Sequence, residues 1–183
     1  MKLFRNPVFA VCLAVVVVIA STLINTNVKF GRKCRAVTDQ FYGASTRGAA
    51  EVSIADALES ICTEAESLSV VADSVGADAK DVRNAVSSLR SSIRNGFFYG
   101  IRSSYDALRS GLTTLLGQLA QAKLDEQNAQ TVSVCSAAIA DAQSAIAASG
   151  YNDTVRAFLR RYDHFPTNVL ARLAGVSMPE AFA

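Results

Sequence analysis

Residues 101–119 read I-R-S-S-Y-D-A-L-R-S-G-L-T-T-L-L-G-Q-L, and the spacing of their apolar side chains decides the fold class. Large apolar residues recur every three or four positions, at Ile101, Tyr105, Leu108, Leu112, Leu115 and Leu119. Because an α-helix completes a turn in about 3.6 residues, this spacing places all of them on one side of a helix. The stretch therefore predicts a long helix with one face buried against other helices.

The same spacing recurs along most of the chain. The further apolar stripes run through residues 30–44, 54–75, 82–93, 132–146 and 151–165. Short connections between long helices make neighbours antiparallel, and sustained steps of three and four favour small crossing angles. Alternating runs bounded by Asn-Gly or Asp-Gly turns, which would indicate strands, do not occur in the sequence. The body is therefore predicted to be all-α, an elongated antiparallel bundle of about four long helices.

An uncharged segment precedes this body. Residues 7–24 read P-V-F-A-V-C-L-A-V-V-V-V-I-A-S-T-L-I, and a membrane-crossing helix needs about 20 mostly apolar residues. We expect residues 1–28 to form an N-terminal transmembrane helix in the lipid bilayer, continuing into the bundle at 29–183. An alternative stays open. The basic start and apolar run also fit a signal peptide, and cleavage after Ala20 would release an exported bundle.

Charge is unevenly distributed along the chain. Residues 1–35 hold six basic residues and no acidic one, so the other 12 basic residues face all 16 acidic ones and residues 36–183 carry a net charge of −4. A nucleic-acid-binding domain needs a basic face, so we expect no nucleic-acid partner. We predict a single-pass protein of the cell membrane. Basic residues after the apolar run favour a cytoplasmic body by a small margin, whereas the signal-like features favour the other side, so the side stays open.

Two motifs late in the sequence carry a resemblance to a known family. They are Y-N-D-T-V at 151–155 and F-P-T-N at 165–168, and the aromatic residue Phe182 follows them. This combination resembles the LemA family of bacterial membrane proteins, whose biochemical role is poorly defined. The resemblance implies a helical bundle on a retained N-terminal anchor. The family's R-R-x-D-L-I-P-N-L motif is replaced by S-I-A-D-A-L-E-S-I at 53–61, so the chain looks like a divergent member.

We interpret the residues of these motifs as structural. Pro166 forces Phe165 out of helical geometry and so ends the last apolar stripe. The aromatic side chains are expected to hold the last segment of the chain on the bundle. The full set is Tyr151, Asn152, Val155, Phe158, Phe165, Pro166, Asn168 and Phe182.

Two of the four cysteines form a candidate pair. Cys34 and Cys62 lie fourteen residues on either side of residue 48, where the helices around 30–44 and 54–75 would turn if they form a hairpin. This symmetry predicts neighbouring side chains, and a disulfide only if the body is exported. Two buried free thiols are the alternative interpretation.

The sequence lacks the residue patterns that carry catalysis. It has one histidine, His164, and no C-x-x-C, phosphate-binding loop or G-x-S-x-G elbow. We therefore expect no enzyme activity, no cofactor and no metal. The predicted role is a membrane-anchored scaffold or interaction protein of the bacterial envelope, with a protein partner or self-association through the bundle. The alternative is a small-ligand carrier or an enzyme, which would need a polar-lined cavity between helices.

Overall fold

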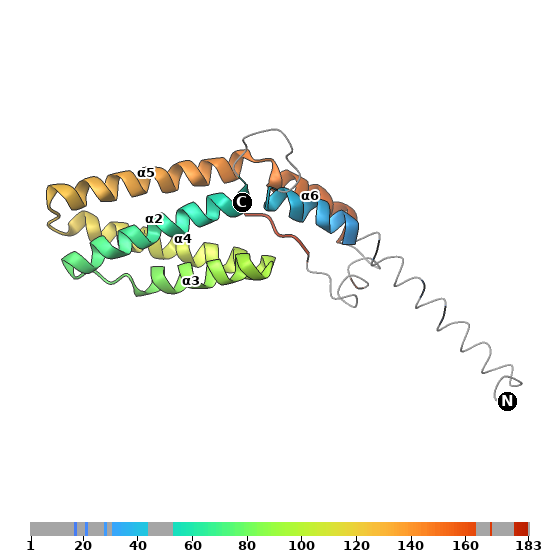
Figure 1. Cartoon of the computed structure of the whole chain (residues 1–183), viewed down its shortest axis with the longest axis horizontal. Coiled ribbons are helices and arrows are strands. Elements are labelled where there is room, and N and C mark those ends of the chain that lie inside the picture. The colour runs from blue at the N-terminus through green and yellow to red at the C-terminus, as the bar shows by residue number, and fades with distance from the viewer. Residues whose placement is uncertain are drawn as a thin grey trace, which may run out of the picture.

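The computed structural model describes residues 31–43, 53–163 and 178–182, with the single positions 17, 21, 28 and 169. Secondary structure in these residues is entirely helical, which confirms the all-α prediction. A helical segment at 31–41 precedes five further helices (Figure 1), namely α2 (Ile54–Val75), α3 (Lys80–Asn95), α4 (Phe98–Gln121), α5 (Glu126–Ala148) and α6 (Tyr151–Tyr162).

Several predictions fall outside the described residues. The anchor at 1–28, apart from positions 17, 21 and 28, and the alternative cleavage site after Ala20 are among them. The same holds for Phe165, Pro166 and Asn168 of the second motif.

The helix ends follow from local side-chain and backbone chemistry. The Ser53 hydroxyl accepts the backbone N–H of Asp56 at 3.0 Å and so caps the start of α2. Asp125 caps α5 in the same way, accepting the N–H of Asn128 at 2.7 Å. Gly96 ends α3 with a φ of 64°, a left-handed conformation that glycine adopts without steric cost.

Four helices pack into the body of the bundle. In Figure 1, α2 lies between α5 and α3, and α3 pairs with α4. All six apolar residues of the stretch that predicted α4 are buried, together with matching stripes on the other helices. Large side chains such as Leu58, Leu68 and Leu89 fill the core, and each has no exposed surface.

The segment at 31–43 does not fold back on α2, so the expected hairpin is not formed. The two meet end to end, because a Cβ placed on Gly43 would lie 3.0 Å from the Cβ of Ser53. From this point they extend in opposite directions (Figure 1), with the segment drawn beside α6. The physical reason is that Phe41, which has no exposed surface, finds its aromatic partners at the end of the bundle and not along α2.

Helix α5 differs from its neighbours in being apolar but poorly covered. Of the described helices, it is the one whose length and composition would suffice to cross a bilayer. It lies mid-chain and packs on α2 within the bundle, whereas the sequence predicts the anchor at residues 1–28. Only Cys135, Ile139 and Ile146 of its 23 residues are buried.

Candidate functional site

A cluster of aromatic rings joins the elements at one end of the bundle. Phe41 lies at its centre, with its ring centroid 5.3 Å from Phe98, 5.6 Å from Tyr151 and 5.8 Å from Phe182. Tyr105 of α4 completes the set, 6.2 Å from Phe182. Aromatic pairs at such separations attract through their quadrupoles in addition to the area they bury. We call these five residues the aromatic junction.

Residues 178–182, which we call the closing segment, lie over this junction without regular secondary structure. The backbone N–H of Phe182 donates to Asn152 Oδ1 at 2.7 Å. The guanidinium Nη1 of Arg102 donates to the backbone carbonyl of Ala181 at 2.9 Å. Two side chains from α6 and α4 therefore bind the N–H and the carbonyl of one peptide group, the amide between Ala181 and Phe182, while the aromatic rings pack on the Phe182 side chain.

One polar atom in the junction has no hydrogen-bond partner in the described part of the chain. The hydroxyl of Tyr151 is buried and, among the residues that the structure describes, none forms a hydrogen bond with it. Burial raises the pKa of Tyr151, and Tyr42 and Glu180 shift it in the same direction. The phenol is therefore neutral throughout the physiological pH range.

The structure brings together three of the predicted motif residues, Tyr151, Asn152 and Phe182. Val155 and Phe158 are buried on the same face of α6, one and two turns after Tyr151. Reasoning from the sequence missed Arg102. Its partner is a backbone carbonyl 79 positions away, and no local pattern marks such a pairing.

The candidate thiol pair is not brought together by a hairpin. Cys34 and Cys62 are both free and buried, Cys34 in the segment before α2 and Cys62 in the middle of α2. Burial raises the pKa of Cys34 to about 11. Burial, with the negative charges of Glu59 and Glu66 added, raises the pKa of Cys62 to about 12, although Arg90 opposes the shift. Both thiols are therefore protonated at neutral pH, which makes them poor nucleophiles.

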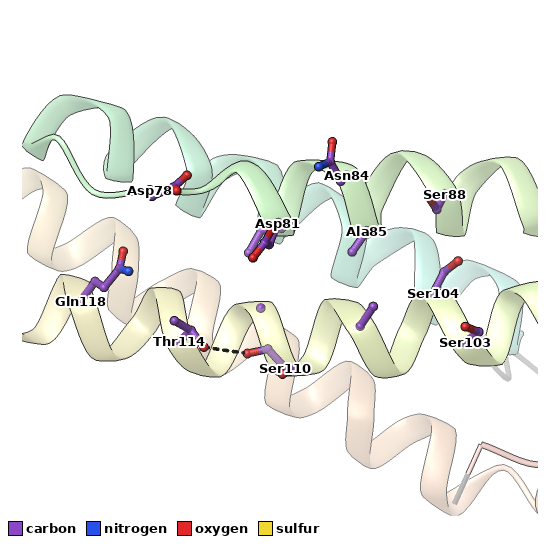
Figure 2. A pocket seen from close by; sticks show the side chains of 13 residues that line it. Asp78, Asp81, Asn84, Ala85, Ser88, Ser103, Ser104, Ser110, Thr114 and Gln118 are labelled. Atoms are coloured by element: carbon purple, nitrogen blue, oxygen red, sulfur yellow. Dashed lines mark hydrogen bonds between the residues drawn. The ribbon is translucent and has the colours of Figure 1, made fainter.

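A polar groove runs along the surface between α3 and α4. It has a volume of about 590 Å³. Figure 2 shows hydroxyl and amide side chains from both helices along it, with Asp78 and Asp81 on the α3 side. Gly111 allows the two helices to approach closely, because a Cβ there would lie 3.2 Å from the Val82 side chain. The groove therefore offers hydrogen-bonding groups beside apolar surface from residues such as Val82 and Ala85.

A second groove, of about 560 Å³, separates α2 from α3 and is crossed by ion pairs. Arg90 Nε donates to Glu59 Oε1 at 2.6 Å, and a second guanidinium nitrogen pairs with Glu66. Arg83 pairs with Asp73 nearer the far end of α2. These contacts neutralise most of the charge inside the groove. Within the described ranges, no three His, Cys, Asp or Glu side chains gather where they could hold a metal ion.

Comparisons of the chain with family models, with curated proteins and with solved structures find no significant match.

Proposed function

We propose that this chain is a membrane-anchored helical bundle that acts as a scaffold or interaction protein of the bacterial envelope, as its resemblance to the LemA family implies. In this proposal, residues 1–28 span the cell membrane once, residues 29–183 form the bundle, and the chain has no enzyme activity. The side of the membrane on which the bundle lies stays open.

The observation that carries the proposal is the firm connection between the bundle and the segment that follows the apolar run. Phe41 of this segment is fully buried in the aromatic junction, and the Tyr42 hydroxyl donates to the Ile93 carbonyl at the end of α3. A helix that leaves the bilayer and is fixed to a bundle in this way would hold the surfaces of α2–α5 at a set distance from the membrane. That is the property that a scaffold requires.

Helix α5 supplies the surface best suited to a partner. Only Glu126 and Asp141 of its residues are charged, only three are buried, and Val134 keeps 58% of its surface accessible. A contiguous exposed apolar patch is the usual mark of a protein interaction site. The proposed partner is therefore another protein or a second copy that covers α5.

A small-ligand carrier is the weaker candidate. A ligand pocket usually buries more than about 70% of its ligand, mostly against apolar side chains. The groove between α3 and α4 is lined largely by exposed serines, threonines and acidic residues, such as Ser88, Ser110 and Asp81. A ligand there would keep much of its surface in water. The groove is therefore a poor site for a carried ligand, and the interaction role is the stronger candidate.

Fractionation followed by intact-mass measurement tests the anchor. We expect the chain to remain in the membrane pellet after alkaline carbonate extraction, with a mass that includes residues 1–20. Recovery of the full-length chain in the soluble fraction would contradict the proposal. A mass that begins after Ala20 would instead identify the exported bundle.

Photo-crosslinking in membranes tests the interaction. A photoreactive residue at Val134, on the exposed face of α5, should give crosslinked products, whereas the same residue at the exposed Thr113 of α4 serves as the control. Recovery of monomer alone from the Val134 variant would count against a partner on α5.

A further inference from the structure

The segment at 31–43 and helix α6 meet at the aromatic junction. Phe41, near the end of the segment, packs on Tyr151, the first residue of α6, with the ring centroids 5.6 Å apart. From this contact both elements extend away from α2–α5, and Figure 1 draws them beside each other. The start of the segment and the end of α6 therefore point in the same direction, away from the bundle.

The buried faces of the two elements belong together. Cys34 and Val37 are buried on the segment, and Val155 and Phe158 are buried on α6. Of helices α2–α5, only α5 makes more than slight contact with α6, so these four helices do not cover the buried face of α6. Among the described elements, the segment is the one that lies along it.

The two elements extend equally far from the junction. Ten positions separate Gly31 from Phe41, and ten separate Tyr151 from Arg161. Both stretches are helical, and an α-helix rises about 1.5 Å per residue, so each far end lies about 15 Å from the junction. The start of the segment is therefore level with the end of α6.

Charge is segregated along this pair of helices. Near the junction each helix carries one acidic residue, Asp39 and Asp153. At the far end, positions 31–35 and 156–163 hold six basic residues against one acidic residue, Asp163. We call these six residues the basic end, and all of them are exposed: Arg32, Lys33, Arg35, Arg156, Arg160 and Arg161.

The chain itself does little to neutralise the basic end. Within the part that the structure describes, Arg156 is the one member with an ion pair, to Asp153 at 3.8 Å. Arg156 and Arg160 are four positions apart on α6, and like charges at this spacing repel each other. Cations stabilise the last turn of a helix, which accounts for part of the charge on α6 but not for that on the segment.

A hollow at the basic end offers a place for an anionic group. It has a volume of about 620 Å³ and is lined by Arg156, Leu159, Arg160 and Asp163. Two guanidinium groups outweigh the single carboxylate, and a guanidinium group binds phosphate through paired hydrogen bonds. The half-buried Leu159 adds apolar surface beside them. A phospholipid headgroup presents this combination, a phosphate next to the apolar part of the lipid.

The proposed anchor would bring the basic end to the surface of the bilayer. Position 28, where the anchor ends in the proposed function, is helical, as are residues 31–41. Four positions separate residue 28 from Arg32, a helical rise of about 6 Å. The headgroup layer on each side of a bilayer is about 5–7 Å thick. Arg32 would therefore lie at the level of the headgroups, and the end of α6 beside it.

We propose that the basic end binds the anionic headgroups of phospholipids, with Arg156 and Arg160 holding one lipid phosphate in the hollow. The rest of the body, residues 36–155 and 164–183, has nine basic and fifteen acidic residues, a net charge of −6. An anionic surface thus attracts the basic end and repels the bundle, which holds the bundle away from the bilayer. This proposal rests on the proposed anchor and does not involve α5.

A single tryptophan reports on the contact. The chain contains no tryptophan, so Tyr162→Trp gives one fluorophore in the last turn of α6. The full-length chain is reconstituted in nanodiscs of phosphatidylcholine, or of an equal mixture with phosphatidylglycerol, each containing a lipid with a nitroxide on its headgroup. We expect stronger quenching in the anionic nanodiscs, and a loss of the difference at high salt. Thr113→Trp, at an exposed position of α4, should show no such difference.

Charge-matched variants test the assigned residues. In the Tyr162→Trp chain, Arg156→Gln with Arg160→Gln should remove most of the extra quenching by phosphatidylglycerol. Arg94→Gln with Arg109→Gln removes the same charge from exposed positions of α3 and α4 and should leave the quenching unchanged. Circular dichroism establishes that each variant is folded.

A titration measures the affinity. Phosphatidylglycerol added to the detergent-solubilised Tyr162→Trp chain should shift the tryptophan emission, whereas phosphatidylcholine should not. Each basic residue close to an anionic surface strengthens binding roughly fivefold. The variant without Arg156 and Arg160 should therefore bind at least about tenfold more weakly, and the variant without Arg94 and Arg109 should bind as the parent does.

Failure of this proposal is distinguishable from failure of the anchor. An inserted chain whose quenching is the same in both kinds of nanodisc overturns the lipid contact and leaves an acidic protein as the partner of the basic end. A chain that stays outside the bilayer refutes the anchor. Co-sedimentation of that chain with vesicles of the same two compositions then decides, because the lipid contact is overturned unless it binds the anionic vesicles alone and loses this binding without Arg156 and Arg160.

Discussion

The Tyr42 hydroxyl donates a hydrogen bond to the backbone carbonyl of Ile93 at 2.7 Å. Ile93 lies in the last turn of α3, where its carbonyl also accepts the backbone N–H of the capping residue Gly96, at 3.2 Å. The bond therefore ties the segment at 31–43 to the end of α3. It adds to the attachment that Phe41 provides by its burial in the aromatic junction. It connects two parts of the chain that are 51 residues apart.

Removing the hydrogen bond between Tyr42 and Ile93 should lower the free energy of unfolding measurably. Tyr42→Phe keeps the ring, which packs edge-on against Phe41 at 4.8 Å, but deletes the hydroxyl. We expect the free energy of unfolding to fall by about 1 kcal/mol, since a typical intramolecular hydrogen bond contributes about 0.5–1.5 kcal/mol net. Urea unfolding followed by circular dichroism measures the change. Tyr99→Phe is the matched control, because Tyr99 is 65% exposed. Equal effects at both positions would contradict the assigned role.

At Tyr151 we do not expect removal of the hydroxyl to lower the free energy of unfolding. Its hydroxyl is buried without a partner in the part of the chain that the structure describes, and such a group costs desolvation energy without a compensating bond. Tyr151→Phe should therefore leave the free energy of unfolding unchanged or raise it by about 1 kcal/mol. The measurement is thermal or urea unfolding beside Tyr42→Phe. A loss of more than about 1 kcal/mol would mean that the hydroxyl has a partner after all.

The sequence predicted the helices better than their partners. The stripe from Ile101 to Leu119 identified every buried residue of α4 except Phe98, because the helical period is a local property of the sequence. The stripes at 54–75 and 82–93 likewise marked the positions of α2 and α3. A stripe states which face is buried but not what covers it. For this reason the segment containing Cys34 was assigned to a hairpin with α2, although Phe41 packs on α4 and α6.

The contacts of the closing segment show the same limit over longer distances. Phe182 was predicted to hold the last segment on the bundle, but its partner at Asn152 is 30 residues away and Arg102 is 79 residues from Ala181. Such pairings depend on how the helices are arranged in space. No periodicity in the sequence encodes them, so only the assembled structure reveals the site.

The free energy of unfolding should depend on pH through the Cys62 thiol. Its thiol has an ordinary pKa of 9.0 and a pKa of about 12 in the folded chain, mainly because it is buried. Between these values the unfolded chain loses the proton and the folded chain keeps it. The free energy of unfolding therefore has its full thiol contribution below pH 9 and falls as the pH rises, by at most about 1.4 kcal/mol per pH unit for this group.

Two measurements test this behaviour. Alkylation of Cys62 at pH 8 should be about a thousandfold slower in the folded chain than in urea, because the thiolate is the reacting form. Mass spectrometry of tryptic peptides distinguishes it from the other cysteines. The Cys62→Ala chain should lose stability less steeply between pH 9 and pH 11 than the wild type. Fast labelling under native conditions would show that the thiol is accessible or ionised.

Arg90 links the stability of the α2–α3 pair to the same thiol. Its guanidinium pairs with Glu59 and Glu66 of α2, and it opposes the rise in the pKa of Cys62. Arg90→Met keeps much of the aliphatic packing but removes the charge. We expect a loss of about 1 kcal/mol that shrinks at high salt, since partly exposed ion pairs are weak and screened.

The two effects of Arg90 can be separated by experiment. Arg94→Met, one turn further along α3, removes an exposed arginine that takes no part in the ion pairs of Arg83 and Arg90, and should change stability little. Without Arg90, the carboxylates of Glu59 and Glu66 act on the Cys62 thiol unopposed, so its pKa should rise further and its alkylation should slow further. Faster alkylation in Arg90→Met than in Arg94→Met, with both chains folded by circular dichroism, would mean that Arg90 acts by covering the thiol and not through its charge.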